Sequence, residues 1–124
     1  MSTSFSVKSE PFEPAVIRLT KQVQTSLPKG SSLKFEIKIL GDDLQLEGVT
    51  RNQSVRDFAQ DNQPLRTVLT ALVQKVDPGQ KLVWVVGPDP DNVKKQVILV
   101  TTRQAAKERS YKLPDEFISK MQSP

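Results

Sequence analysis

The side chains available for chemistry are limited, because the 124-residue chain contains neither cysteine nor histidine. Their absence excludes disulfides, thiolate nucleophiles, zinc sites built from these residues, and acid–base catalysis by imidazole. The five glycines are scattered, and the G-x-x-x-x-G-K pattern of a phosphate-binding loop does not occur. Serines, lysines and carboxylates remain, but no spacing singles out a catalytic set. We therefore predict a protein that is not an enzyme and that uses no cofactor.

Two acidic stretches have the density of oxygen atoms that a cation site needs. Asp89-Pro90-Asp91-Asn92 superficially resembles a calcium loop. An EF-hand loop that starts at Asp89 needs glycine at its sixth position and glutamate at its twelfth, where this chain has Lys94 and Val100. Aspartate, asparagine and proline also set the geometry of tight turns, and Asp42-Asp43 suits a turn or a helix cap equally well. We interpret both stretches as turns and predict no metal site.

The charge balance leaves nucleic-acid binding as an alternative function. The net charge is +4, which is compatible with a solvated surface, an acidic partner or nucleic acid. RNA-binding sheets usually carry aromatic side chains among basic ones, whereas the open face of a strand predicted at residues 33–39 carries Lys34, Glu36 and Lys38. The candidate basic patch for nucleic acid comprises Lys94, Lys95, Arg103, Lys107, Arg109 and Lys112.

The clearest structural pattern is a helix followed by a β-hairpin, within residues 62–102. Apolar residues recur at helical spacing over residues 65–76, Pro64 suits the first helical position, and residues 77–79 end the helix. This spacing places Thr70 on the opposite, exposed face. Two β-branched runs at residues 82–86 and 97–101 follow, with a turn-rich segment between them. Trp84 lies inside the first run, which favours a place in the core.

The first half of the chain shows a similar order of strand, helix and strand. Residues 4–8 alternate apolar and polar side chains, and residues 33–39 do so without a fault, so the lysines there are expected to face water. We predict a short helical turn or an irregular plug at residues 44–49, closed by Gly48, and a weaker strand at residues 53–60. The buried stripe of the helix between the first two strands comprises Val16, Leu19, Val23 and Leu27.

These elements predict an α+β fold of order β-α-β-β-α-β-β, with two helices packed against small sheets. Two helices of this length cannot cover a large sheet, so we expect them between or beside two small ones. No apolar run approaches ~18 residues, and we expect no membrane insertion. Residues 103–124 are polar and basic, with one helical turn expected at residues 104–109. Further on, Phe117 is expected to cover a core edge or to contact a partner.

The pattern resembles the short N-terminal domain of secretins and TonB-dependent receptors, the STN domain. The likeness rests on a strand leading into Pro64-Leu65, on L-V-W-V-V at residues 82–86 and on V-I-L-V-T-T at residues 97–102. G-V-T-R-N at residues 48–52 and the segment Tyr111-Lys112-Leu113-Pro114 are similar to versions of this domain in large planctomycete-type bacterial proteins. The resemblance divides the chain into an STN-like domain at residues 1–102 and a C-terminal extension at residues 103–124.

In that family the domain is a non-catalytic docking module, usually beyond the inner membrane and attached to something larger. The resemblance therefore implies a protein–protein interaction or assembly module that belongs to, or docks to, a larger envelope-associated protein. The chain departs from the family by lacking the basic start and apolar stretch of a signal peptide, and by lacking a barrel. We accordingly expect a cytoplasmic protein, or a periplasmic one if the chain is a piece of an STN-type protein.

A sheet edge is the surface on which we expect a protein partner to bind. Edge strands offer unpaired N–H and C=O groups to an added strand, and residues 53–60 have the weakest apolar pattern of the predicted strands. The candidate interaction edge comprises Arg51, Asn52, Gln53, Val55 and Asp57.

Overall fold

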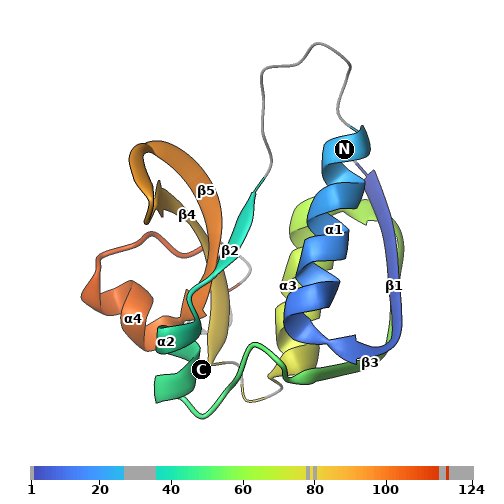
Figure 1. Ribbon diagram of the computed structural model, residues 1–124, viewed down its shortest axis with the longest axis horizontal. Helices are drawn as coiled ribbons and strands as arrows, with labels where there is room; N and C mark the ends of the chain where they lie inside the picture. Colours follow the sequence, from blue (N-terminus) through green and yellow to red (C-terminus); the bar gives the residue numbers. More distant parts are fainter. Residues whose placement is uncertain (1, 27–35, 78, 80, 115–116, 118–124) are drawn as a thin grey trace.

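A computed structural model describes residues 2–26, 36–77, 79, 81–114 and 117 of the chain. It confirms the α+β class expected from the sequence (Figure 1). In chain order the elements are β1 (Ser2–Pro11), α1 (Phe12–Ser26), β2 (Ile37–Ile39), α2 (Gly41–Leu46), β3 (Ser54–Pro64), α3 (Leu65–Val76), β4 (Leu82–Asp89), β5 (Asn92–Thr102) and α4 (Arg103–Glu108).

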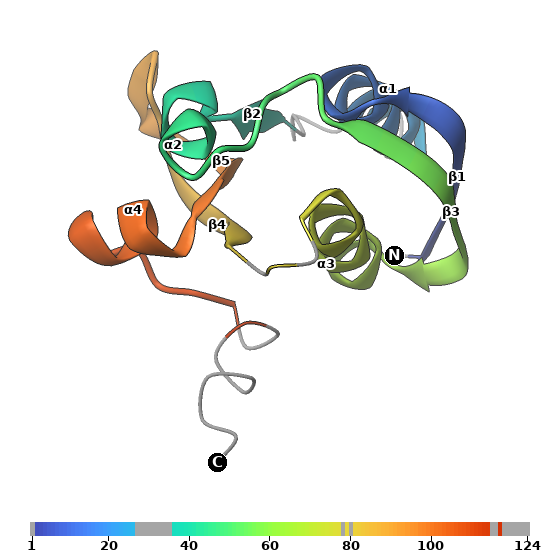
Figure 2. The same ribbon diagram turned by 90° about the horizontal axis from the view of Figure 1, so that it is seen from below.

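The two longer helices, α1 and α3, form a layer between two small sheets (Figure 2). One sheet has two strands in the order β1-β3, which are antiparallel, and the other has three in the order β2-β5-β4. In the three-stranded sheet β5 lies at the centre, parallel to β2 and antiparallel to β4. The short helices α2 and α4 lie on the far side of this sheet from α1 and α3. No described helix has the length and apolar character that crossing a membrane requires.

Helix α3 is buried over an unusually wide arc, because sheets cover it from both sides. At 100° per residue its buried positions, from Val68 to Val76, span an arc of about 200°, twice the stripe of a helix that rests on one layer. Thr70 is part of this arc, so its predicted exposure is wrong. The Thr70 hydroxyl accepts a 2.9 Å hydrogen bond from Nε1 of Trp84. Both residues are buried, so this hydrogen bond lies within the core.

Helix α1 begins directly after β1, and carbonyl groups from the turn before β3 accept hydrogen bonds from the first N–H groups of α1. The N–H groups of Phe12 and Glu13 donate to the carbonyl oxygens of Gln53 and Arg51, at 2.8 and 2.9 Å. These bonds satisfy two of the donors that every helix start leaves without a partner inside the helix. The predicted stripe is buried at Val16, Leu19 and Val23, whereas its fourth member, Leu27, lies outside the described residues.

The first half departs from prediction at β2. The described part of this strand is short, and the predicted residues 33–35 lie outside the described chain. Lys38 does not simply face water. Its ammonium group is bound by Asp89 and Asp91 from the β4–β5 hairpin, and its side chain keeps 28% of its accessible surface. The alternation of apolar and polar residues therefore predicted strand β2, but it did not predict that Lys38 binds the two aspartates of the hairpin.

The β4–β5 hairpin is longer and its turn tighter than predicted. Gly87 and Asp89 belong to β4, and the turn contains only Pro90 and Asp91, with Asp89 paired to Asn92. The Asp89 carboxylate accepts a 2.9 Å hydrogen bond from the Asp91 N–H, the local bond by which aspartate favours a turn. This confirms the interpretation of the acidic stretch as a hairpin turn.

The C-terminal segment packs against the same core as the rest of the chain. In α4, Ala105 and Ala106 are buried, and the hydroxyl of Thr102 caps the helix by accepting from the Ala105 N–H. Phe117 keeps only 1% of its surface and meets the Trp84 ring edge to face, with centroids 6.3 Å apart. The expected helical turn is therefore present, and the core continues beyond residue 102.

Thr70→Ala removes the acceptor of the buried Trp84 N–H. We expect the free energy of unfolding to fall by about 2–4 kcal/mol, because a buried donor left unpaired costs about 1–3 kcal/mol and the lost methyl group about 1 kcal/mol more. Thr70→Ser keeps a hydroxyl and is the matched control, with a loss of about 1 kcal/mol for one methyl group. Urea denaturation followed by circular dichroism measures both. Equal losses in the two variants would show that the hydrogen bond adds no stability.

Strand β3 contains Asp57 at φ 52°, a left-handed conformation in mid-strand. This residue changes the alternation, so that Val55 and Phe58, three positions apart, are both buried. Aspartate tolerates this conformation better than most residues, whereas other side chains lose about 1–2 kcal/mol in it and a β-branched one is especially unfavourable.

We therefore expect Asp57→Val to lower the free energy of unfolding by about 1–2 kcal/mol and Asp57→Gly to preserve it. Ala59→Val is the control, because Ala59 is an exposed residue of the same strand without a positive φ. Urea titrations of the three variants provide the comparison. If Asp57→Val and Ala59→Val were equally stable, the left-handed backbone would impose no constraint on the side chain.

Candidate functional site

The candidate interaction edge is divided between a turn and a strand. Arg51, Asn52 and Gln53 precede β3 and are exposed, although the carbonyls of Arg51 and Gln53 hold the start of α1. Val55 and Asp57 lie within β3. The Val55 side chain is fully buried and cannot contact a partner, whereas Asp57 is exposed. The structure therefore leaves the backbone of β3, with its exposed side chains, as the surface available at this edge.

The two edges of the β1-β3 sheet differ in what covers them. Along β1, the carbonyl oxygens of Ser4 and Ser6 accept hydrogen bonds from the side chains of Gln22 and Arg18 on α1. Arg18 also pairs with Glu10, and its guanidinium group lies 4.5 Å from the centroid of a buried phenylalanine ring of β1. Side chains of α1 thus occupy acceptors along the free edge of β1.

The outer edge of β3 pairs with no strand of the described chain. In antiparallel pairs successive residues direct their backbone groups alternately toward and away from the partner strand. Ala59 lies opposite Ser6, whose carbonyl points away from β3 to Arg18, so the N–H and C=O of Ala59 point to the open side. Eight of the eleven β3 residues are exposed, which leaves this edge accessible.

The candidate basic patch is not one surface. Lys94 and Lys95 lie near the start of β5, whereas Arg103 begins α4, which follows the end of β5. The seven steps of the backbone from Lys95 to Thr102 span roughly 23 Å at the rise of an extended strand. Three further cations lie after Arg103, in or beyond α4.

Several of these cations are also engaged within the protein. Lys95 pairs with Glu36, and the Arg109 guanidinium group binds Asp43. Arg103 donates a 3.3 Å hydrogen bond to the Phe117 carbonyl and lies over the Phe117 ring, 5.6 Å from its centroid. This arrangement does not favour the phosphate-tracking surface that nucleic-acid binding requires.

A buried carboxylate that sequence reasoning missed lies at Asp43. Its side chain keeps 7% of its surface and accepts two hydrogen bonds from Arg109, at 2.6 and 2.7 Å, and one of 2.6 Å from the Thr101 hydroxyl. The hydrogen bonds from Arg109 hold the Asp43 carboxyl pKa below its ordinary value, and the Thr101 hydroxyl adds to the effect, although burial opposes it. The bonds connect α2, β5 and the end of α4.

A second ionic cluster forms at the tip of the hairpin. Nζ of Lys38 lies 2.6 Å from Asp89 and 2.8 Å from Asp91. The hydrogen bond from Lys38 lowers the Asp89 carboxyl pKa, with a further contribution from the Asp91 N–H. The hydrogen bonds that Lys38 donates to the Asp89 and Asp91 carboxylates raise the Lys38 pKa above its ordinary value. Each cluster joins residues more than 50 positions apart in the sequence. The sequence therefore contains the charged residue types but no signal for how they pair.

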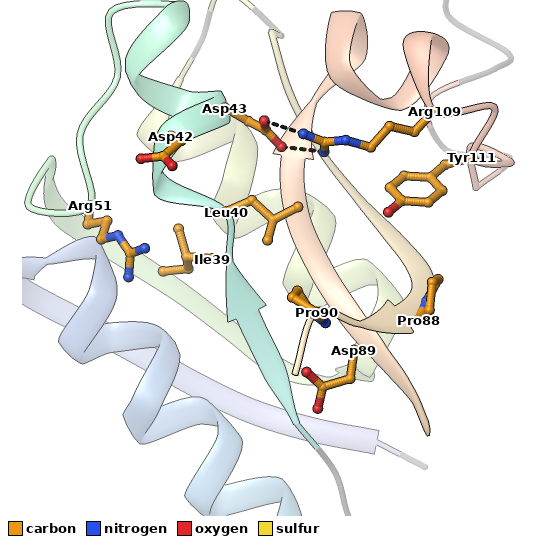
Figure 3. A pocket seen from close by; sticks show the side chains of 10 residues that line it. All are labelled: Ile39, Leu40, Asp42, Asp43, Arg51, Pro88, Asp89, Pro90, Arg109 and Tyr111. Carbon is orange, nitrogen blue, oxygen red and sulfur yellow. Dashed lines mark hydrogen bonds and ion pairs between the residues drawn. The ribbon is translucent and has the colours of Figure 1, made fainter. Parts of the chain in front are cut away.

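A cavity of about 410 Å³ lies between these two clusters (Figure 3). It is formed by the end of β2 and the start of α2 on one side, and by the hairpin tip and the segment after α4 on the other. Its lining comprises Ile39, Leu40, Asp42, Asp43, Arg51, Pro88, Asp89, Pro90, Arg109 and Tyr111. A β-carbon at Gly87 would make only an ordinary contact of 3.6 Å with the Tyr111 ring, whereas its approach to Cδ1 of Leu99, at 3.2 Å, would be tight.

A more open groove of about 460 Å³ follows β4 on its α3 side. Trp84 and Val86 line it together with Leu113, and Arg66 and Lys112 contribute cations. Within the described part of the chain, no three carboxylates gather closely enough to hold a metal ion. Of these two hollows, the cavity has more charged side chains in its lining than the groove.

Comparison of the chain with protein-family models, with curated proteins and with solved structures found no match.

Arg109→Leu leaves Thr101 as the remaining partner of Asp43. We expect the free energy of unfolding near pH 7 to fall by about 1–3 kcal/mol, toward the lower end because the Arg109 side chain is 44% exposed. Since the folded pKa of Asp43 lies below the ordinary 3.8, the stabilisation is present above that pH and is lost as the pH falls through the folded pKa.

The difference between wild type and Arg109→Leu should therefore shrink between about pH 7 and about pH 3. Arg56→Leu, at an exposed arginine of β3, is the control and should change stability little at either pH. Urea denaturation at both pH values measures the three proteins. A constant difference would mean that the pair does not control the ionisation of Asp43.

Proposed function

We propose that the protein is a non-catalytic protein–protein interaction module of the STN type, and that its partner adds a strand to the open edge of β3. The order of strands and helices supports the STN-like assignment, because both halves of the chain provide a strand, a helix and a further strand. The position of α1 and α3 between a two-stranded and a three-stranded sheet also agrees with the expected packing of two helices against small sheets. The proposal that the module belongs to a larger envelope-associated assembly rests on the resemblance alone.

The observation that carries the proposal is the difference between the two edges of the β1-β3 sheet. Side chains from α1 bind the outward carbonyls of Ser4 and Ser6, as expected for an edge that is protected against pairing. No comparable bond from the described chain covers the outward groups of Ala59 on β3. An added strand gains affinity from backbone hydrogen bonds at such an edge and specificity from alternate side chains.

The chemistry of β3 indicates what kind of segment would pair there. Its exposed side chains near Ala59 include Arg56, Asp57 and Asp61, so the strand offers both signs of charge and little apolar surface. Asp57 and Asn62, both at positive φ, interrupt the regular strand on either side of Ala59. We infer a short, extended and polar partner segment centred on Ala59, rather than a long apolar strand.

Ala59→Pro tests this proposal directly. Proline removes the outward N–H, and because this N–H points away from β1, the β1-β3 hydrogen bonds are retained. We expect a partner that is crosslinked to the wild-type protein in native extract to be lost with Ala59→Pro and retained with Ala59→Ser, which keeps the N–H. Circular dichroism and urea denaturation establish that both variants are folded.

Two outcomes would count against strand addition. A folded Ala59→Pro protein that captures the same partner with the same yield would move the binding surface away from β3. A wild-type protein that retains no partner under crosslinking would remove the support for an interaction module altogether. The Ala59→Ser control separates a requirement for the backbone N–H from a general sensitivity of the exposed strand to substitution.

A further inference from the structure

The walls of the cavity between α2 and the hairpin tip are largely apolar. Leu40, Pro88, Pro90 and Tyr111 provide hydrocarbon and ring surface, and the Tyr111 side chain lies across the cavity from Asp42 (Figure 3). A volume of about 410 Å³ is within the range of natural ligand pockets, which combine mainly apolar walls with a few polar groups. Such walls suit a short alkyl chain.

The charges of the lining favour a positive ligand. The lining contains the carboxylates of Asp42, Asp43 and Asp89 against the guanidinium groups of Arg51 and Arg109, so one carboxylate is in excess. Four of these five groups already have a partner of opposite charge. Arg51 binds Glu13 at 2.9 Å, Arg109 binds Asp43, and Asp89 binds a lysine of β2.

The fifth group, the Asp42 carboxylate, has no hydrogen-bond or ion-pair partner among the described residues, and it is exposed at the cavity mouth. An anionic ligand would have to displace an internal carboxylate to reach a guanidinium group. A cation can approach Asp42 without breaking any of the existing pairs, which is the less costly arrangement.

We propose that this cavity binds an alkyl chain that ends in an ammonium or guanidinium group, with the chain against the apolar walls and the cation at Asp42. A free diamine and the lysine or arginine side chain of a peptide share this chemistry. The proposal does not depend on strand addition at β3, because none of the wall or charge contacts involves the outward backbone groups of that strand.

Titration of the isotope-labelled full chain, followed by amide chemical shifts, tests the proposal with four probes. n-Butylammonium should cause saturable shifts at Leu40, Asp42 and Tyr111. Methylammonium should bind several-fold more weakly because it leaves the apolar walls empty. Butyrate, which has the opposite charge, should cause no saturable shift. 1-Butylguanidinium should bind at the same residues as n-butylammonium.

Asp42→Asn should weaken n-butylammonium binding about three- to fivefold, the size expected for one exposed ion pair. Asp61→Asn, the same substitution at an exposed residue of β3, is the matched control and should leave binding unchanged. Cadaverine, a free diamine, and N-acetyl-lysine methylamide, which mimics a lysine in a peptide, then distinguish the two kinds of ligand. Tighter binding of cadaverine assigns the site to free diamines, and tighter binding of N-acetyl-lysine methylamide assigns it to a peptide side chain. Equal effects of the two variants, equal binding of butyrate, or no saturable shift would overturn the proposal.

Discussion

The structure depends on one constraint, which is that α3 is apolar over more than one face. A helix buried over about 200° cannot be satisfied by a single sheet, so the chain supplies a layer on each side of it. Both layers are consequently small, with two and three strands. Small sheets have a high proportion of edge strands, and the uneven protection of β1 and β3 follows from this architecture.

Much of the fold could be predicted because its signals are local. Helical spacing predicted α1 and α3, and β-branched runs with turn residues between them predicted β4 and β5. Thr70 was wrongly predicted to be exposed, because the spacing of apolar residues identifies only the helix face that packs against one sheet. The second sheet buries the Thr70 hydroxyl, which accepts the hydrogen bond of the Trp84 indole N–H. Asp57 was missed as a conformational element, because aspartate in a weak strand gives no signal that its φ is positive.

The candidate site was harder to predict because its side chains are paired over long distances in sequence. Arg109 was grouped with neighbouring cations as one basic surface, yet it neutralises a carboxylate on α2. Lys38 was expected to face water, yet it forms ion pairs with two carboxylates, Asp89 and Asp91, at the tip of the β4–β5 hairpin. A net charge of +4 consequently does not describe the local fields, since the described cavity lining has an excess of carboxylates.

The strand pairing also has a consequence for how the chain folds. Among the described strands, only β4 and β5 form a hairpin of neighbours in sequence. The other two described pairs join segments more than 40 residues apart, for example Pro11 with Ser54 and Ile37 with Ile98. Closing such loops costs entropy before the contacts form. The hairpin and the helices are therefore expected to form first, whereas β1 can pair only when the chain up to residue 64 is present and β2 only when the chain up to residue 100 is present.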